Sequence, residues 1–279
     1  MLRPAEPAQQ LRRYVRKYVH VESSLADSVF WPIPARSVTC IEFTFRDPYR
    51  IHPVDGTGLE ITYPSTLIGA KTCQRIRLEL HGHVETFVIL FQPTGLQRLF
   101  SLPGGLIVNE HYEADLVLGP AVERLRLQLG ETESFAERIA IANAFLTARI
   151  PRVDDARCTD GAVQQIVSNH GDVRILDLAG HAGLGLRQFE RQFTDDVGIS
   201  PKLYARIVRF EAAVQKRTVS SCINWTTIAH ELGYHDQMHM IHDFQLLSGE
   251  SPTSLAPHLE YLSSVAIRPP GLNAGIPVE

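Results

Sequence analysis

The sequence predicts an α+β N-terminal domain built on an antiparallel sheet, sandwich-like or barrel-like in shape, followed by an all-α C-terminal domain. In the first hundred residues, apolar and polar side chains alternate at period two, which is the pattern of β-strands. After residue 119 the apolar side chains recur at the three- and four-residue spacing of helices. A polar segment that begins with a proline, 151–156, marks the boundary between the two domains, and a length of 279 residues suits two domains.

Composition excludes several classes of protein. Hydrophobic residues make up 44% of the chain and charged residues 21%, as in soluble globular proteins, and the net charge is −4. No apolar run approaches the roughly 18 residues of a transmembrane helix, and the first ten residues lack the apolar core of a secretory signal. The four cysteines lie far apart without a Cys-x-x-Cys pair, which argues against a zinc cluster or a disulfide framework. We therefore expect a cytoplasmic protein without membrane association.

The N-terminal domain is predicted to contain a short helix, several strands and two further helices. Apolar side chains in residues 11–19 have helical spacing, so we expect the first helix there. Alternating patterns separated by turn residues predict strands at 37–45, 58–63, 74–80 and 84–91. Gly82 predicts a turn between the last two strands. Helices at 119–129 and 134–150 complete a domain that spans 1–151.

An internal repeat dominates the C-terminal domain, which we place at 158–262. The segment Asp177-Leu-Ala-Gly-His-Ala-Gly183 aligns with Thr227-Ile-Ala-His-Glu-Leu-Gly233 at a spacing of fifty residues. After one extra residue in the second copy, further positions match: Phe193, Gly198, Ser200 and Pro201 with Phe244, Gly249, Ser251 and Pro252. Each copy predicts a short helix, a tight turn at the glycine and a second helix, so the domain is a double helix-turn-helix. The Pro/Gly-rich residues 263–279 are predicted to be a disordered tail.

Apolar spacing predicts which helix faces are buried. In the second helix of the first copy, Leu186, Phe189 and Phe193 form an apolar stripe, so the polar side chains between them are expected to face outward. A long helix between the copies carries a similar stripe, formed by Leu203, Ile207, Phe210 and Val214. Each Ser-Pro pair suits a helix start, with serine as the N-cap and proline as the first helical residue.

The paired motifs resemble the double helix-turn-helix module of the AraC/XylS family of bacterial transcription regulators. The resemblance is carried by Ile175-Leu-Asp-Leu-Ala179, Gly183-Leu-Gly-Leu-Arg-Gln-Phe-Glu-Arg-Gln-Phe193, Ile228-Ala229 and Gly249-Glu-Ser-Pro252. The preceding region resembles an N-terminal domain of unassigned function in Tyr63-Pro-Ser-Thr-Leu-Ile-Gly69 and Phe91-Gln-Pro-Thr-Gly95. The resemblance implies a sequence-specific DNA-binding transcription regulator that is not an enzyme, uses no cofactor or metal, and has double-stranded DNA as its partner. It also implies an N-terminal domain that senses a small-molecule effector or pairs two subunits into a homodimer.

The same resemblance implies that the second helix of each copy reads base edges. The positions implied to contact DNA are Arg187, Gln188, Glu190 and Arg191 in the first copy, and Gln237, Met238, Ile241 and His242 in the second. Arginine can bind guanine, glutamate can accept from cytosine, glutamine can read adenine, and apolar side chains can touch the thymine methyl group. The two helices would enter successive major grooves about 34 Å apart on one face of the duplex.

Departures from the family pattern weaken the second copy. His242 replaces a usual arginine, Leu246 replaces a common basic residue, and Thr218 to Ile267 contains no lysine or arginine. Phosphate attraction is therefore reduced there, and Asp236 and Asp243 flank the recognition positions. In the first copy, Gly185 stands where a capping serine is usual, which is a small loss because glycine also caps.

Two other functions compete with DNA reading. The first is a ligand-sensing or protein-interaction module whose second helix-turn-helix binds DNA weakly, which the missing positive charge supports. The second is a metal-dependent β-barrel enzyme, because His81, His83 and Glu85 alternate at period two and could share one strand face. The sequence offers no third histidine at an obvious spacing, and Gly82 indicates a turn, so the metal interpretation is the weaker of the two.

Overall fold

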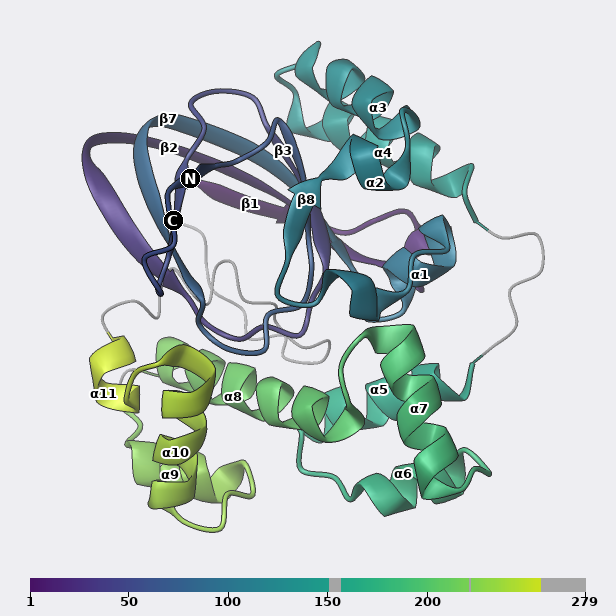
Figure 1. Cartoon of the computed structure of the whole chain (residues 1–279), viewed down its shortest axis with the longest axis vertical. Coiled ribbons are helices and arrows are strands. Elements are labelled where there is room, and N and C mark those ends of the chain that lie inside the picture. The colour runs from purple at the N-terminus through teal and green to yellow at the C-terminus, as the bar shows by residue number, and fades with distance from the viewer. Residues whose placement is uncertain (151–156, 221, 257–279) are drawn as a thin grey trace.

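The computed structural model describes residues 1–150, 157–220 and 222–256. An antiparallel sheet forms the N-terminal part, with helices beside it, and a cluster of helices lies below the sheet in Figure 1. This arrangement confirms the predicted α+β domain followed by an all-α domain. The predicted tail at 263–279 lies outside the described residues. Within the described part of the chain, every helix is too short or too polar to cross a bilayer.

Among the described residues the sheet has eight strands, and its main path runs β1-β2-β7-β3-β6-β8. The additional strand β4 pairs with the first part of β7, and β5 pairs with β4. Because β1 and β8 remain at opposite edges of the path, the sheet does not close into a barrel. The strands are β1 (Leu2–Ala5), β2 (Val15–Ile33), β3 (Cys40–Thr44), β4 (Arg50–Pro53), β5 (Glu60–Ile61), β6 (Ser65–Ile68), β7 (Ile76–Phe91) and β8 (His111–Glu113).

The prediction of a helix at 11–19 is wrong. A 3-10 turn, η1 (Gln9–Leu11), is followed after three residues by β2, a strand of 19 residues. The first part of this strand is buried on both faces: Tyr18 packs with the core under the helices, whereas Val19 packs on the opposite face of the sheet. A strand with two apolar faces shows neighbouring apolar pairs that imitate helical spacing, so periodicity alone could not distinguish the two.

The turn predicted at Gly82 is also wrong, because β7 runs without interruption through this residue. Gly82 has φ +76° and lies opposite a bulge in β2 between Leu25 and Val29. A Cβ atom at this position would lie 2.3 Å from a carboxylate oxygen of Asp47. The glycine thus permits an irregular, bulged strand instead of ending it.

Helices cover one face of the sheet. They are α1 (Gly95–Phe100), α2 (Ala114–Leu118), α3 (Ala121–Gly130) and α4 (Phe135–Thr147), with a 3-10 turn, η2 (Gly104–Ile107), between α1 and α2. The helices predicted at 119–129 and 134–150 are confirmed by α3 and α4. Their apolar side chains share one core with the sheet, including Leu125 and Leu146 against Phe43, Phe87 and Ile89.

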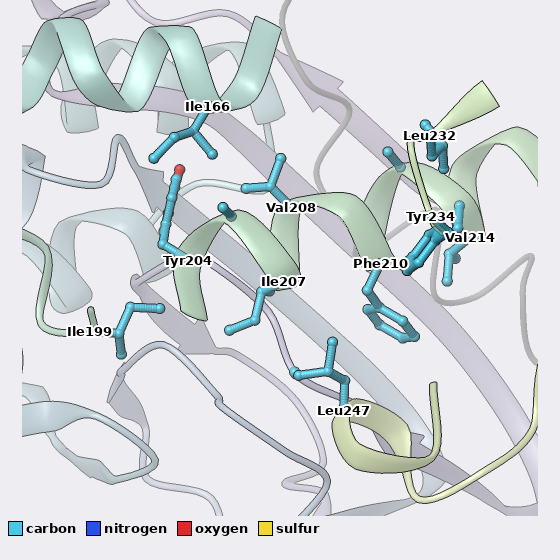
Figure 2. Packing of buried hydrophobic residues seen from close by; sticks show 14 of the residues in the cluster. Ile166, Ile199, Tyr204, Ile207, Val208, Phe210, Val214, Leu232, Tyr234 and Leu247 are labelled. Atoms are coloured by element: carbon cyan, nitrogen blue, oxygen red, sulfur yellow. The ribbon is translucent and has the colours of Figure 1, made fainter. Parts of the chain in front are cut away.

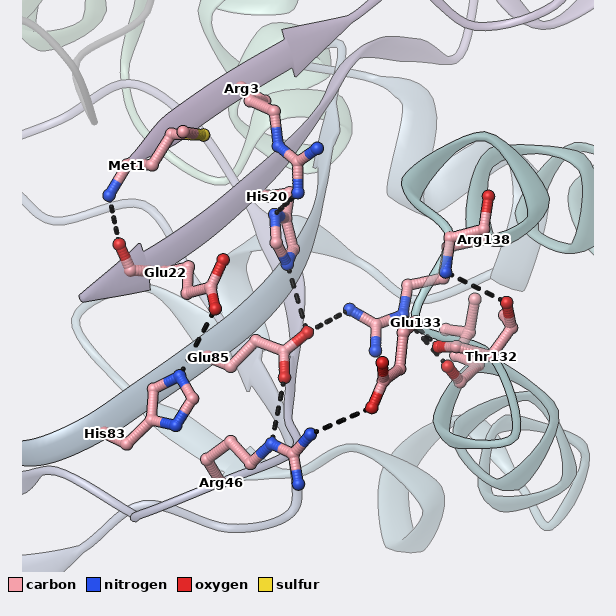
Figure 3. Close-up of polar contacts among 12 residues, drawn as sticks. Met1, Arg3, His20, Glu22, Arg46, His83, Glu85, Thr132, Glu133 and Arg138 are labelled. Carbon is pink, nitrogen blue, oxygen red and sulfur yellow. Dashed lines mark hydrogen bonds and ion pairs between the residues drawn. The ribbon is translucent and has the colours of Figure 1, made fainter. Parts of the chain in front are cut away.

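A buried ion network joins α4 to the sheet (Figure 3). Nη1 of Arg138 lies 2.6 Å from Oε1 of Glu85 on β7, and the guanidinium lies 4.0 Å from the ring centroid of Phe45. His20 and Arg46 also bond the Glu85 carboxylate, at 3.1 and 3.3 Å. Burial by itself would raise the pKa of Glu85, but the hydrogen bonds from Arg138 and His20 hold it below its usual range. The network therefore keeps α4 in one orientation on the sheet.

The C-terminal domain is built around one long central helix, α8 (Pro201–Val219). The predicted stripe is confirmed at Ile207, Phe210 and Val214, which are buried (Figure 2). Leu203, the fourth residue of the stripe, is partly buried. Ser200 caps α8 by accepting a hydrogen bond from the Leu203 amide at 3.3 Å, with Pro201 as the first helical residue. The other helices are α5 (Cys158–Ser168), α6 (Ile175–His181), α7 (Leu186–Val197), α9 (Trp225–Glu231), α10 (Gln237–Ser248) and α11 (Pro252–Leu255).

Candidate DNA interface

The two copies of the repeat fold into the same local structure, α6-turn-α7 and α9-turn-α10. In the first turn the Leu184 amide donates to the Ala179 carbonyl at 3.0 Å, and in the second the Tyr234 amide donates to Ala229 at the same distance. The two turn glycines have nearly equal positive φ angles, +68° at Gly183 and +67° at Gly233. Both alanines are buried, so the helices of each pair approach closely. The predicted double helix-turn-helix is confirmed.

The outward face of α7 carries the residues predicted to contact DNA. Phe189, Phe193 and Val197 are buried in the domain core. The four predicted contact residues are all exposed: Arg187, Gln188, Glu190 and Arg191. Leu186 was expected in the buried stripe, but it is 39% exposed. As the first residue of α7, it lies at the edge of the core, where it adds an apolar side chain to the exposed end of the helix.

The outward face of α10 is chemically different. Met240, Phe244 and Leu247 are buried, while the predicted contact residues Gln237, Met238 and His242 are exposed and Ile241 is partly exposed. Met238 is 69% exposed and is the most exposed of the predicted apolar contact residues. The face therefore presents a thioether, an amide, an aliphatic group and an imidazole, without a lysine or arginine.

Thr226 is a residue of this face that the sequence did not single out. Its hydroxyl donates to Oε1 of Gln237 at 2.8 Å across the turn between α9 and α10. The bond holds the carboxamide of Gln237 with its oxygen toward α9. The pattern contained no signal for it, because threonine is common at the start of helices and its partner lies eleven residues away.

Basic side chains in the C-terminal domain divide into two groups. Three on α8 are paired within the protein, whereas Lys202 at the start of the same helix is exposed: Arg206 lies 2.6 Å from Asp243, Arg209 lies 3.5 Å from Asp172, and Lys216 lies 2.7 Å from Glu231. Arg187 and Arg191 on α7 have no ion-pair partner among the described residues. These two guanidinium groups are thus available to a negatively charged ligand.

Asp243 does not flank the recognition surface as expected. It is 1% exposed, and both Nε and Nη2 of Arg206 bond its Oδ1 at 3.2 and 2.6 Å. The ion pair joins α10 to α8 on the buried side of α10, where Asp243 and the next residue, Phe244, both face the domain core. Its charge is consequently directed to Arg206 and away from solvent.

The starts of the two recognition helices differ in charge. Gly185 caps α7 without a side chain, whereas Asp236 caps α10 and accepts a hydrogen bond from the His239 amide at 2.7 Å. The hydrogen bond from the His239 amide, together with one from His235, holds the pKa of Asp236 below its usual range. A carboxylate at the start of α10 occupies the position where helix amides favour an anion, so a DNA phosphate is disfavoured there.

The residues of the metal interpretation do not form a metal site in the described structure. Glu85 is buried in the ion network with Arg138, and Nε2 of His83 lies 3.3 Å from Glu22, while His81 is exposed. No group of three or more histidine, cysteine or carboxylate side chains among the described residues is arranged to hold a metal ion.

Comparison with known protein families agrees with this geometry. A family profile described as a helix-turn-helix domain matches residues 178–256, which span both recognition helices. The C-terminal domain is an AraC-type helix-turn-helix domain. A second profile, for a domain of unknown function, matches residues 3–113. The AraC-type domain makes the chain a DNA-binding transcription regulator, and an interaction module with decayed DNA binding is not favoured.

Solved structures of similar architecture include ToxT from Vibrio cholerae O395, with 10% identity, 89% of this chain and 98% of that chain covered, and a TM-score of 0.48. ToxT of strain SCE256 bound to an unsaturated fatty acid has 10% identity, coverage of 90% and 97%, and a TM-score of 0.49. The AraC-like transcriptional activator CuxR has 11% identity, coverage of 79% and 86%, and a TM-score of 0.31. No curated protein matches the sequence significantly.

Proposed function

We propose that α7 and α10 bind one DNA duplex in a sequence-specific manner, in successive major grooves, and that α7 supplies most of the electrostatic attraction. The observation that carries this proposal is the exposure of Arg187 and Arg191 without an ion-pair partner among the described residues. They are one helical turn apart on the outward face of α7. A recognition helix needs apolar residues on the face that packs on the domain core. It also needs hydrogen-bond donors on the opposite face that are not already bonded within the protein.

In the first half-site, Arg187 and Arg191 bind guanine edges or phosphates, and Glu190 accepts a hydrogen bond from cytosine. Gln188 lies on the same exposed surface and supplies an amide to a neighbouring base or phosphate. Leu186 extends this face with an exposed apolar group at the start of the helix.

In the second half-site, reading relies on neutral groups. Met238 and Ile241 contact thymine methyl groups, and His242 donates to a base or a phosphate. Because Thr226 holds the Gln237 oxygen, the Gln237 amide nitrogen is the end that faces a base acceptor. This half-site contributes sequence preference with little salt dependence, since few phosphates are neutralised by fixed charge.

Selection of bound fragments from a random pool of double-stranded DNA tests this function. The full chain should enrich a motif with two parts centred about 10 base pairs apart, on one face of the duplex. Glu190→Gln should change the enriched bases in one part only. If no motif is enriched above the starting pool, the chain does not read DNA sequence in this way.

The N-terminal domain is proposed to bind a small-molecule effector or to pair two chains as a homodimer. The face of the sheet opposite the helices supports an effector site. An apolar cluster on that face combines residues from β2, β3, β6 and β7, and among the described residues it includes none from a helix. Glu42 of β3 lies at this cluster and accepts a hydrogen bond from Tyr49.

Thermal stabilisation by members of a metabolite library tests the effector role, and sedimentation of the free protein tests the homodimer. Neither role involves a catalytic step, and since a regulator acts where its DNA lies, we propose the cytoplasm as its location.

A further inference from the structure

The segment between β2 and β3 leaves the sheet and enters the C-terminal domain. Ala35 is 1% exposed and belongs to the same buried cluster as Phe210, Phe244 and Leu247 of the double helix-turn-helix. All other fully buried members of that cluster, among the described residues, lie between positions 162 and 255. A residue of the N-terminal domain is therefore part of the core that supports the second recognition helix.

Ala35 also completes the backbone hydrogen bonding of α10. Its amide donates to the carbonyl of Leu247 at 2.7 Å. Leu247 lies in the last turn of α10, where carbonyl groups have no partner within the helix. The N-terminal domain thus supplies a donor that the recognition helix cannot supply itself.

Ser37, two residues further on, is bound to the linker helix. Its amide and its hydroxyl donate to the two carboxylate oxygens of Glu211 on α8, each at 2.9 Å. Glu211 is 7% exposed, and the positive charges of Arg16 and Arg36 lie close enough to interact with it. A buried carboxylate needs its donors, because an unsatisfied charge in the interior is costly. The contact is consequently specific in geometry.

A stretch of three residues therefore bridges α8 and α10. Within the C-terminal domain, α10 is attached to α8 through Arg206–Asp243 and through the rings of Phe210 and Phe244, whose centroids are 4.8 Å apart. The bridge adds an attachment at the C-terminal end of α10, far along the helix from its exposed first turn. A small rotation about the inner contacts would change the direction of that first turn, and the bridge opposes such a rotation.

The first helix-turn-helix is attached to the N-terminal domain elsewhere. Gly104 of η2 packs against the backbone of Gly198 after α7, where a Cβ on Gly104 would lie 3.0 Å from the Gly198 nitrogen. Asp160 of α5 accepts from Thr94 at 2.9 Å and pairs with Arg98 at 3.1 Å. These contacts do not involve residues 35–37. Perturbation of the bridge should therefore affect one recognition helix and leave the other.

We propose that Ala35 and Ser37 are positioning residues for DNA recognition: they set the orientation of α10 on α8, and through it the fit of the second half-site. The inference rests on the proposed function, in which α10 reads DNA. It assigns to the N-terminal domain a direct part in the geometry of the DNA-binding surface. The bridge follows directly from Ile33, the last residue of β2, so changes in the sheet are transmitted to α10 through it.

The test uses the full chain and a DNA fragment selected from a random pool. Binding is measured by fluorescence anisotropy to three probes: the intact fragment, a fragment with the second half-site scrambled, and fragments with the half-site spacing changed by one or two base pairs. The variants are Ser37→Ala and Glu211→Gln. Ser37→Thr, which retains the hydroxyl, tests rescue, and Glu131→Gln, at an exposed position in the N-terminal domain, is the matched control.

Ser37→Ala and Glu211→Gln should weaken binding to the intact fragment about three- to tenfold, the range for loss of one hydrogen bond. Their binding to the probe without a second half-site should equal that of the parent, and their preference among spacings should be broader. Ser37→Thr and Glu131→Gln should behave like the parent. Circular dichroism confirms that each variant is folded.

Three results would overturn the proposal: unchanged binding to the intact fragment, an equal loss on both probes, or tighter binding. The second of these would indicate general destabilisation, and the third would show that the bridge opposes DNA binding. Failure of the proposed function is a separate outcome, since the parent protein would then not distinguish the selected fragment from a scrambled one.

Discussion

Replacing His242 by arginine should strengthen DNA binding by the second recognition helix. Helices α7 and α10 are both twelve residues long, and His242 holds the sixth position of α10, as Arg191 does in α7. The side chain is exposed. The neighbouring Asp243 is bound to Arg206 inside the domain, so it would not neutralise the new charge. The arginine would then face the DNA backbone as Arg191 does.

The size of the effect follows from the chemistry of one contact. A neutral hydrogen bond contributes about 0.5–1.5 kcal/mol and one to a charged group about 1.5–3 kcal/mol. The substitution should therefore add about 1 kcal/mol, or roughly fivefold in affinity. One additional neutralised phosphate should steepen the dependence of log K on log salt by about 0.9.

Fluorescence anisotropy with the selected fragment, over a range of salt concentrations, measures these changes. Gln128→Arg on α3 is the control for net charge, because its position is exposed on the N-terminal domain. Equal affinity and equal salt slope in the parent and His242→Arg would show that α10 does not meet the DNA backbone at this position.

Four further substitutions test other parts of the structure. Arg187→Ala and Arg191→Ala should each cost about 1–3 kcal/mol of specific binding and relax the preference at one base pair, as measured by competition with single-base variants of the selected site; parent-like discrimination would remove them from the interface. Arg138→Met should lower the free energy of unfolding by about 3 kcal/mol in urea titrations, because the buried Glu85 carboxylate loses its shortest partner; a loss below about 0.5 kcal/mol would contradict the role of the network. Burial lowers the pKa of Lys71 from 10.5 to about 8, so the folded state binds fewer protons than the unfolded state between these values, and stability due to this group rises with pH there. Between pH 8 and 10.5 the parent should gain about 3 kcal/mol relative to Lys71→Met, and parallel stability curves would show that the ammonium is not desolvated.

The C-terminal domain could be predicted in detail because its signals are local. The turn glycines, the Ser-Pro helix starts and the spacing of Phe189 and Phe193 each specify a backbone conformation or a buried face within a few residues. Because the motif occurs twice, each predicted helix and turn is supported by two copies of the same pattern. The outward placement of Arg187 and Arg191 follows from the same spacing.

The N-terminal domain was less predictable because its strands depend on partners distant in sequence. Residues 11–19 have helical spacing, yet from Val15 onward they pair with β7 some seventy residues later, and this pairing decides their conformation. In the sequence, a glycine such as Gly82 is equally compatible with a turn and with a bulged strand. In the structure, the close approach of Asp47 to Gly82 belongs to the bulged strand.

Some features of the candidate site could not be inferred from any sequence pattern. Asp243 is a charged residue at a position that periodicity leaves open, and Arg206 on another helix determines that it is buried. The contacts of Ala35 and Ser37 join positions more than 170 residues apart in the chain. Tertiary contacts of this kind become visible only in the folded structure.

Hydroxyl-radical footprinting of the full chain on a selected DNA fragment tests the central claim most directly. Two recognition helices held at opposite ends of α8 should protect two segments centred about 10 base pairs apart on one face of the duplex. Because α7 presents fixed positive charge and α10 does not, raising the salt concentration should weaken protection of the α7 segment more than that of the α10 segment, with α7 and α10 assigned by repeating the experiment with Arg191→Ala. A single protected segment, or two segments that Arg191→Ala weakens equally, would contradict the account.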